Sequence, residues 1–431
     1  MTTFAIATLG CKVNTFESCG YQNAMIQKGY QEVDFKEVAD VYIINTCAVT
    51  NIAASKSRQK IHQAKAKNPN ALICVVGCYV QVGYEYLKEH EQIDVLVGSE
   101  GKNEFADMIE QALLGNKVET KLHDVRASSV FEALPLNHFE HQTRAFLKIQ
   151  DGCNQFCSYC IIPYARGKER CMKVEEVLSL ANTLCDFGHK EIVLTGIHTG
   201  RYGNGKDVTL TSLLKRLSKE VDKLKRIRIS SIEMNEVSDE LLQLMKEDDK
   251  IAKHLHIPLQ AGCDKTLKNM NRPYNMEQFK KRIAYIRNLI PDISISSDVI
   301  VGFPQESDED FKISQQNIEE INFSFLHVFP YSAKQGTKAA KMSGHLDNNV
   351  KKQRVSALVN TSKKLYTKYK ENFIGKEVEV LFEKNKNNML IGHSSEYLEV
   401  MVDLDESYLN QIVKVKITQL QDDILIGEVI K

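Results

Sequence analysis

The first third of the chain repeats one pattern three times, a short apolar run followed by a loop with cysteine near its start. The runs cover residues 4–9, 41–45 and 72–76. Stretches with helical patterning, such as 17–28 and 53–67, separate them. Short runs rich in Val and Ile that alternate with helices predict a parallel α/β sheet.

Cysteines close to the ends of these runs are the first candidates for chemistry. Cys11, Cys47 and Cys78 each follow one run. Right-handed crossovers bring the carboxyl ends of parallel strands to one edge of a sheet, where ligands bind. We therefore expect the three thiols to converge, although free cysteines are often only small buried hydrophobic residues.

The middle of the chain alternates strands with helices over residues 144–371. Helical patterning is clearest at 174–187 and 276–289. Six such strands predict a partial (βα)6 barrel, with its chemistry on loops at the carboxyl ends of the strands. The expected strands are 145–149, 191–195, 226–230, 254–258, 294–301 and 325–329.

The last sixty or so residues, 372–431, have a different pattern of short alternating segments, which predicts a small antiparallel β-barrel. The expected strands are 377–382, 398–402, 412–420 and 425–430. The overall expectation is an α/β protein. Its units are an open parallel α/β sheet domain, a linker, a central barrel and a C-terminal β-barrel, at residues 1–125, 126–143, 144–371 and 372–431.

Composition narrows the class of protein. A chain of 431 residues is longer than one hydrophobic core usually organises. Lys and Arg balance Asp and Glu at 56 each, so a nucleic-acid site would have to be a local patch. No apolar stretch is long enough for a membrane span, and the N-terminus does not resemble a signal peptide. Eleven dispersed cysteines suit metal chemistry in the cytoplasm better than a secreted disulfide framework.

The most informative motif is CxxxCxxC, formed by Cys153, Cys157 and Cys160. Three thiolates can hold three irons of a four-iron cluster and leave the fourth iron open to a ligand. Electron-transfer clusters usually have four cysteines, so the motif favours a cluster that binds a substrate or cofactor. A zinc site is the alternative for three close cysteines.

Four stretches, TLGCKVNTFES, ADVYIINTCAVTNIAASKSRQKI, VVGCYVQ and DGCNQFCSYCIIPYARGKER, resemble the radical S-adenosylmethionine (SAM) methylthiotransferases. The resemblance extends over essentially the whole chain. It implies that Cys153, Cys157 and Cys160 bind the 4Fe-4S cluster that cleaves SAM. It also implies an auxiliary 4Fe-4S cluster on the other three cysteines and a C-terminal TRAM domain that assists RNA binding.

The same resemblance implies positions for SAM. Gln260 and Arg272 are expected to face the reaction chamber. Backbone groups of residues 298–303 are expected to hold adenine. The residues expected to contact SAM are Tyr159, Thr195, Gly196, His198, Ser231, Glu233, Asp298, Val299 and Ile300.

Candidate RNA contacts lie beside the cysteine loops. Lys56, Arg58 and Lys60 form a basic stretch without acids just after Cys47. The other candidates are Lys12, Asn14 and Asn51. A solvated helix face is the alternative for this stretch and for a second basic run at 350–370. The C-terminal unit has six Lys against eleven Asp and Glu, so it cannot attract RNA by bulk charge.

Within the family, GCKVN and TCAVTNIAASKSRQ resemble the branch that methylthiolates carbon 2 of N6-threonylcarbamoyladenosine next to the anticodon of tRNA. The expected partners are that tRNA and an external low-potential electron donor. Two other branches remain open, one acting on isopentenyladenosine in tRNA and one on a ribosomal protein. A redox-sensing, RNA-binding iron–sulfur protein without turnover is the non-enzyme alternative.

Overall fold

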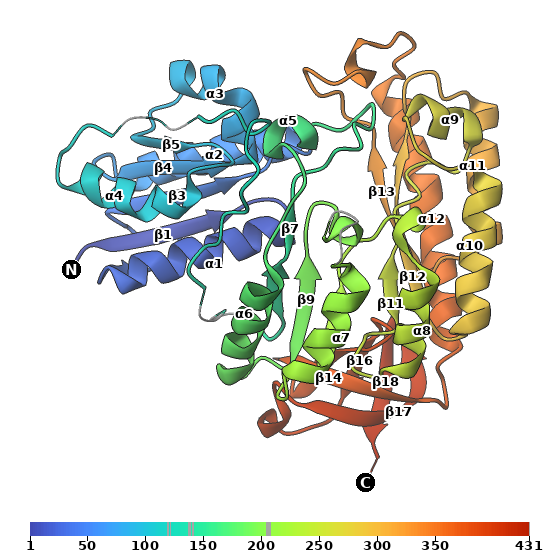
Figure 1. Ribbon diagram of the computed structural model, residues 1–431. Helices are drawn as coiled ribbons and strands as arrows, with labels where there is room; N and C mark the ends of the chain where they lie inside the picture. The colour runs from blue at the N-terminus through green and yellow to red at the C-terminus, as the bar shows by residue number, and fades with distance from the viewer. Residues whose placement is uncertain (119, 121, 137–138, 140–141, 204–207, 431) are drawn as a thin grey trace.

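The N-terminal unit is a three-layer α/β/α sandwich, shown in blue and cyan in Figure 1. The computed structural model describes residues 1–118, 120, 122–136, 139, 142–203 and 208–430. The parallel sheet has the order β2-β1-β3-β4-β5. Its strands are β1 (Thr3–Thr8), β2 (Gln31–Glu32), β3 (Val41–Thr46), β4 (Leu72–Gly77) and β5 (Val95–Val97).

Helices cover both faces of this sheet. Helices α1 (Lys12–Gln27) and α4 (Phe105–Leu113) pack on the face that carries Phe4 and Val41. Helices α2 (Asn51–Lys67) and α3 (Cys78–His90) pack on the opposite face. Because β1, β3 and β4 are adjacent and parallel, their carboxyl ends meet at one edge, as the pattern of apolar runs predicted.

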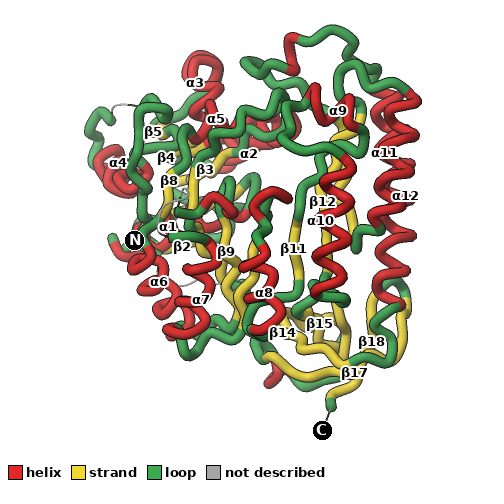
Figure 2. The backbone as a smooth tube through the Cα atoms, turned by 45° about the vertical axis from the view of Figure 1, so that its right-hand side comes forward, coloured by secondary structure: helices red, strands yellow, loops and turns green. Residues whose placement is uncertain are grey.

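The central unit is a partial barrel made of two parallel three-stranded sheets, β10-β9-β6 and β11-β12-β13. An isolated bridge between Ile227 and Ile251 joins them. Outer helices pack against the strands, and Figure 2 shows α10, α11 and α12 along one side. The strands are β6 (Ala145–Lys148), β9 (Glu191–Thr195), β10 (Arg226–Ile229), β11 (His254–His256), β12 (Ser294–Val301) and β13 (Phe325–Pro330). The helices are α6 (Val174–Asp186), α7 (Leu210–Glu220), α8 (Asp239–Glu247), α10 (Met276–Leu289), α11 (Asp308–Ile321) and α12 (Asn348–Glu371).

The strands present different residues to their two faces. Ile227, Ile229 and Leu255 belong to the hydrophobic core under the outer helices. Successive strand residues point to opposite faces, so Arg228, His254 and their alternating neighbours face inward. The interior of the barrel is therefore polar, unlike the core around it.

A closed β-barrel forms the C-terminal unit, at the bottom of Figure 1 in red. It closes the end of the central barrel where the strands begin. Arg226 donates to the carbonyls of His393 and Glu379, and Arg228 donates to those of Ser394 and Ser395. The strands are β14 (Glu377–Lys386), β15 (Met389–Ser394), β16 (Glu399–Val402), β17 (Ile412–Gln421) and β18 (Ile424–Val429).

The predicted α/β architecture is confirmed, with some differences in detail. Strands β2, β5 and β15 were not predicted. The proposed linker at 126–143 includes residues 137, 138, 140 and 141, which lie outside the described residues. Part of it is packed, because Leu134, Leu136 and Phe139 are buried in hydrophobic clusters, whereas Arg126 and Val130 are exposed. Within the described residues, no helix has the length and apolar character that a membrane span needs.

Candidate active site between two cysteine loops

Cys11, Cys47 and Cys78 lie at the carboxyl edge of the N-terminal sheet. Cys11 precedes α1, Cys47 follows β3 and Cys78 is the first residue of α3. Gly10 has a φ of +117°, and a Cβ at this position would lie 3.1 Å from the Cys47 Sγ. The loop after β1 therefore approaches Cys47 closely only because residue 10 is glycine.

Two polar side chains connect these cysteines. The Asn14 Oδ1 lies 3.5 Å from the Cys11 Sγ, and its Nδ2 donates to the Thr46 carbonyl at 2.9 Å. Arg166, in the short helix α5 (Ile162–Arg166), donates through Nη2 to the Asn14 Oδ1 at 3.3 Å. Its Nε lies 3.1 Å from the Cys78 Sγ. The shared partners bring the three strand-end cysteines together.

Arg166 belongs to a buried network of charges. Glu17 accepts from Lys102, Lys148 and Arg166 at 2.7, 2.9 and 2.8 Å. Asp151 lies 2.6 Å from Lys148 and 3.2 Å from Arg166. Arg170 also lies 3.8 Å from Asp151 and pairs with Glu100, so the network joins four cations to three carboxylates. Arg166 is the cation that also contacts a sulfur.

The CxxxCxxC loop follows β7 (Gln150–Asp151) in the central barrel. Cys157 is buried, and Arg272 Nη1 donates to its Sγ at 3.3 Å. Arg272 also forms an ion pair with Glu233, and the backbone N–H of Gln155 points to the Cys153 Sγ at 3.4 Å. The structure therefore brings the predicted residues Arg272 and Glu233 to the cluster loop.

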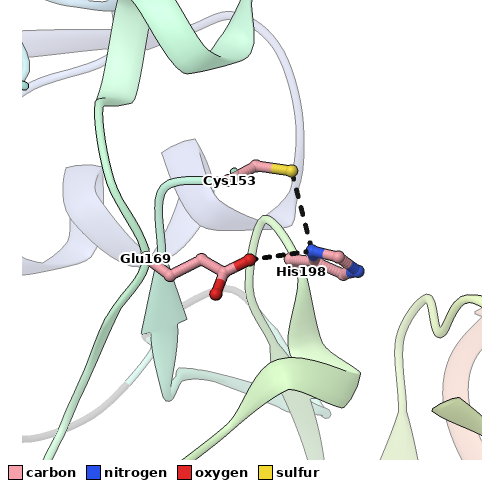
Figure 3. Close-up of side chains that lie close together, drawn as sticks. All are labelled: Cys153, Glu169 and His198. Carbon is pink, nitrogen blue, oxygen red and sulfur yellow. Dashed lines mark hydrogen bonds and ion pairs between the residues drawn. The ribbon is translucent and has the colours of Figure 1, made fainter. Parts of the chain in front are cut away.

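His198 stands beside the first cysteine of the motif, as Figure 3 shows. Its Nδ1 lies 3.6 Å from the Cys153 Sγ and 3.4 Å from Glu169, and its Nε2 lies 2.8 Å from Glu236. Burial alone would lower the pKa of His198, but its contacts with Cys153, Glu169 and Glu236 raise it to about 12. The ring is therefore protonated and can donate to a thiolate.

Burial disfavours the thiolate form of three of these cysteines. Burial raises the pKa of Cys47 to about 11 and that of Cys160 to about 12, and it also raises the pKa of Cys11. A metal must displace these protons, so binding would release them. Cysteine thiolates are the usual ligands of iron–sulfur clusters, and N–H donors to sulfur tune them. The donor set and its surroundings therefore fit such clusters at both cysteine loops.

One cavity of about 250 Å³ touches both loops. Val49 and Thr50 come from the loop after Cys47, and Tyr159 and Cys160 come from the CxxxCxxC loop. The carboxyl ends of β12 and β13 complete the wall. Five residues predicted from the sequence line this cavity, namely Tyr159, Cys160, Gln260, Asp298 and Ile300.

Backbone groups at the end of β12 already form hydrogen bonds within the protein. The Gln260 N–H donates to the Asp298 carbonyl at 2.9 Å, and the Ile300 N–H donates to the Gln260 carbonyl at 2.8 Å. The Val299 side chain is in the hydrophobic core. An adenine held by the backbone of these residues would have to share groups that already form hydrogen bonds with Gln260.

The remaining predicted SAM residues lie close to the ends of the first strands. Thr195 is buried at the end of β9, and its carbonyl accepts from the Ile149 N–H at 2.9 Å. A Cβ at Gly196 would lie 3.1 Å from Gln150, whose Oε1 accepts the His198 N–H. Ser231 is half-buried just after β10.

The candidate RNA residues do not form one surface. Asn14 is buried, and its amide contacts protein groups as described above, so we assign it a structural role instead of an RNA contact. Asn51 bonds to Ala333 and Lys334 across the interface with the central barrel. Lys12 and Lys56 are exposed.

The other two cations of the basic stretch contact aromatic rings. Arg58 donates to the Tyr79 hydroxyl at 2.7 Å and lies over the Tyr86 ring. Lys60 lies over the Phe35 ring. In the second basic run, Arg354 is buried and pairs with Glu306 and Asp308, so it belongs to the fold.

Several residues of the site were not predicted. Glu17 lies 85 positions from Lys102 and 131 from Lys148, and no spacing rule connects them, whereas Asp151 and Glu169 lie in the same stretch as the CxxxCxxC motif. Arg166 could have been predicted from the sequence, because it lies within the stretch that directly follows the CxxxCxxC motif. His327 was also missed, and it is a strand residue without any motif around it that indicates chemistry.

Comparison with known proteins agrees with this geometry. Residues 3–98 match the uncharacterized protein family UPF0004, and residues 147–315 match the radical SAM superfamily. The threonylcarbamoyladenosine tRNA methylthiotransferase MtaB of Bacillus subtilis is 42% identical over 97% of this chain and 94% of its own. The tRNA-2-methylthio-N(6)-dimethylallyladenosine synthase of Thermoanaerobacter sp. is 34% identical over 99% and 93%.

The solved structure of the radical SAM methyltransferase TsrM from Kitasatospora setae has a similar fold. The TM-score is 0.58 at 12% identity, over 79% of this chain and 77% of that one. The fold and the three-cysteine loop of the central barrel define a radical SAM enzyme, which uses SAM and a 4Fe-4S cluster. The chain belongs to the radical SAM methylthiotransferase family.

Proposed function

We propose that this protein attaches a methylthio group to carbon 2 of N6-threonylcarbamoyladenosine next to the anticodon of tRNA. The observation that carries the proposal is the cavity whose wall includes both cysteine loops. A base in that cavity would lie between two metal sites. The relative from Bacillus subtilis, which is named for this substrate, supports the choice of base.

Six cysteines would hold the cofactors. Cys153, Cys157 and Cys160 would ligate the cluster that binds SAM, and Cys11, Cys47 and Cys78 would ligate an auxiliary cluster. When bound, the two clusters and SAM supply the radical that activates an aromatic C–H bond and the sulfur that joins it. An external low-potential donor would supply the electrons, and we expect the enzyme to work on the cytoplasmic tRNA pool.

The protein's own groups would orient and shield this chemistry. Arg272 and His198 would donate N–H groups to the sulfurs of Cys157 and Cys153 and orient these ligands. The cavity wall is mostly apolar, with Ile161 and Phe329 among its residues. Such a wall excludes water, which would otherwise quench reactive species. The target base lies in a single-stranded loop, so turning it into the cavity costs little.

The experiment that tests this proposal separates the two cysteine sets. Replacing Cys153, Cys157 and Cys160 with Ala should leave about four irons per chain after reconstitution and no 5′-deoxyadenosine, since one four-iron cluster remains. Replacing Cys11, Cys47 and Cys78 should also leave about four irons. This second variant should still form 5′-deoxyadenosine from SAM but no methylthiolated tRNA.

The control is Cys185→Ala, a buried cysteine of α6 that is remote from both loops and should keep about eight irons, the content of two four-iron clusters. Iron falling to zero in either triple variant would contradict independent sites. A wild-type protein that forms no 5′-deoxyadenosine under reduction would instead favour the redox-sensing alternative.

A further inference from the structure

The interior of the central barrel below the cavity is lined by histidines and aromatic rings. At its base, the His254 ring stacks on the Tyr397 ring of the C-terminal barrel, with centroids 4.7 Å apart, and on the Phe325 ring, with centroids 6.4 Å apart. The next inward positions along the strands are His256, Asp298 and His327. Asp298 also belongs to the cavity wall, so this polar layer is continuous with the cavity.

Lys12 extends from the N-terminal unit toward the same interior. It begins α1 directly after Cys11. The Lys12 ammonium group interacts electrostatically with the side chains of Tyr397, Arg144 and Arg228. It also interacts with the His327 ring. The side chain is nevertheless exposed to solvent. Lys12 is therefore accessible to solvent and lies near groups from three units, and we call the region between these groups the chamber.

Most charged groups around this chamber already have partners. Arg144 pairs with Glu383 at 2.7 Å, Arg228 with Glu191 at 2.7 Å, and His256 with Asp298 at 3.3 Å. In the described part of the chain, the side chains of Lys12 and His327 make neither a hydrogen bond nor an ion pair. Two N–H donors therefore face the chamber without an acceptor.

An anion fits this arrangement better than a metal cation. The ligand atoms of His256, Asp298 and His327 lie within 4.8 Å of one another, which is compatible with a metal site. However, Asp298 is their only carboxylate and is already paired with His256, whereas the nearby Lys12 ammonium group has no partner. Such surroundings repel a divalent cation and attract a carboxylate.

We propose that Lys12 and His327 bind the carboxylate of the threonyl group on the target base. This inference rests on the proposed function, because only a threonylcarbamoyl substituent brings a carboxylate into the chamber. Lys12 would supply a point charge from the side of the auxiliary cysteines, and His327 would supply an N–H from β13. The two residues would then select the substrate by its charged end, while the cavity holds the base.

Synthetic anticodon stem-loops test the proposal directly. One carries threonylcarbamoyladenosine, and the other carries the same nucleoside with its carboxylate converted to the primary amide, which is nearly isosteric and neutral. We expect the wild-type enzyme to prefer the carboxylate by about 10- to 100-fold in kcat/KM, the range expected for a hydrogen bond to a charged group.

His327→Phe and Lys12→Met should each lose most of this preference, because activity on the carboxylate falls while activity on the amide stays. A residue that only supports the fold would lower both activities equally. Lys36→Met is the matched control, since Lys36 is exposed and precedes β3, at the edge of the sheet away from Cys11. Iron content of the Lys12 variant reports whether its neighbour Cys11 still binds a cluster, and the His327 variant tests the pocket independently.

Three outcomes would overturn the proposal that Lys12 and His327 bind the carboxylate. The first is equal wild-type turnover of the two stem-loops, which would leave the proposed function standing. The second is an unchanged preference in both variants. The third is one equivalent of zinc per chain that His327→Phe removes, which would identify a metal site instead. A wild-type enzyme inactive on both stem-loops but active on isopentenyladenosine would refute the proposed function itself.

Discussion

At the scale of single residues, Arg166 joins the two cysteine loops. It follows the CxxxCxxC loop by six positions in the sequence and contacts Cys78 of the N-terminal unit. Glu17 holds Arg166 from the other side, and both side chains are fully buried. Burial would raise the pKa of Glu17, but Arg166, Lys102 and Lys148 lower it far below its usual range. The carboxylate is therefore charged and fixes the position of the guanidinium.

We expect Glu17→Gln to destabilise the protein by about 3–5 kcal/mol, because it removes the carboxylate that three buried cations share. Urea unfolding measures the loss. Glu37→Gln, at an exposed position, is the control and should change stability by less than about 0.5 kcal/mol. An unfolding free energy for Glu17→Gln within error of the wild type would show that the network does not hold the two units together.

At the scale of elements, the apolar runs at residues 41–45 and 72–76 were sufficient to predict β3 and β4, because a fully buried strand has few polar positions. Strand β2 has only Gln31 and Glu32, which carry no apolar pattern. The two cysteine sets were predictable from position and spacing. The network around Arg166 was not, because its hydrogen bond with Glu17 joins residues 149 positions apart.

One buried carboxylate positions two of the arginines that attach the C-terminal barrel. Glu191 pairs with Arg226 at 3.1 Å and Arg228 at 2.7 Å, and both guanidiniums donate to carbonyls of the C-terminal barrel. Burial would raise the pKa of Glu191, but Arg228 and Arg226 lower it to about 2 from an ordinary 4.5. A lowered pKa in the folded state adds stability above pH 4.5, and this stability is lost as the pH falls toward 2.

Glu191→Gln should therefore lower the melting temperature at pH 7 and flatten the dependence of stability on pH between about 5 and 2. Thermal unfolding across this range, compared with the wild type, measures both effects. Glu309→Gln, at an exposed position of α11, should keep the wild-type profile. If the Glu191 variant also follows the wild-type profile, the Glu191 carboxylate does not cause the dependence of stability on pH.

At the scale of the whole molecule, three units surround one chamber. The N-terminal sheet supplies one cysteine set, the central barrel supplies the other, and the C-terminal barrel closes the base (Figure 1). The acidic C-terminal barrel is therefore at the end opposite the cavity mouth. Of the basic stretch on α2, Lys56 is exposed, whereas Arg58 lines a second hollow of about 300 Å³ with Tyr79 and Tyr86.

We expect Lys56→Gln to weaken tRNA binding and to reduce the log–log slope of affinity against salt by about one unit, the effect of one lost phosphate contact. Filter binding over a range of salt concentrations measures the slope. Lys67→Gln, at the far end of the same helix, should leave it unchanged. A wild-type slope in the Lys56 variant would assign this cation to the solvated surface.

The most direct test of the central claim is a competition between two tRNAs in one reaction. Reconstituted enzyme, SAM and a reductant are mixed with equal amounts of tRNA carrying threonylcarbamoyladenosine and tRNA carrying isopentenyladenosine, and nucleosides are measured by mass spectrometry. A chamber with unpartnered polar donors rejects an apolar substituent, so we predict at least about 100-fold more methylthiolated threonylcarbamoyladenosine. Preferential methylthiolation of isopentenyladenosine would contradict the proposed substrate.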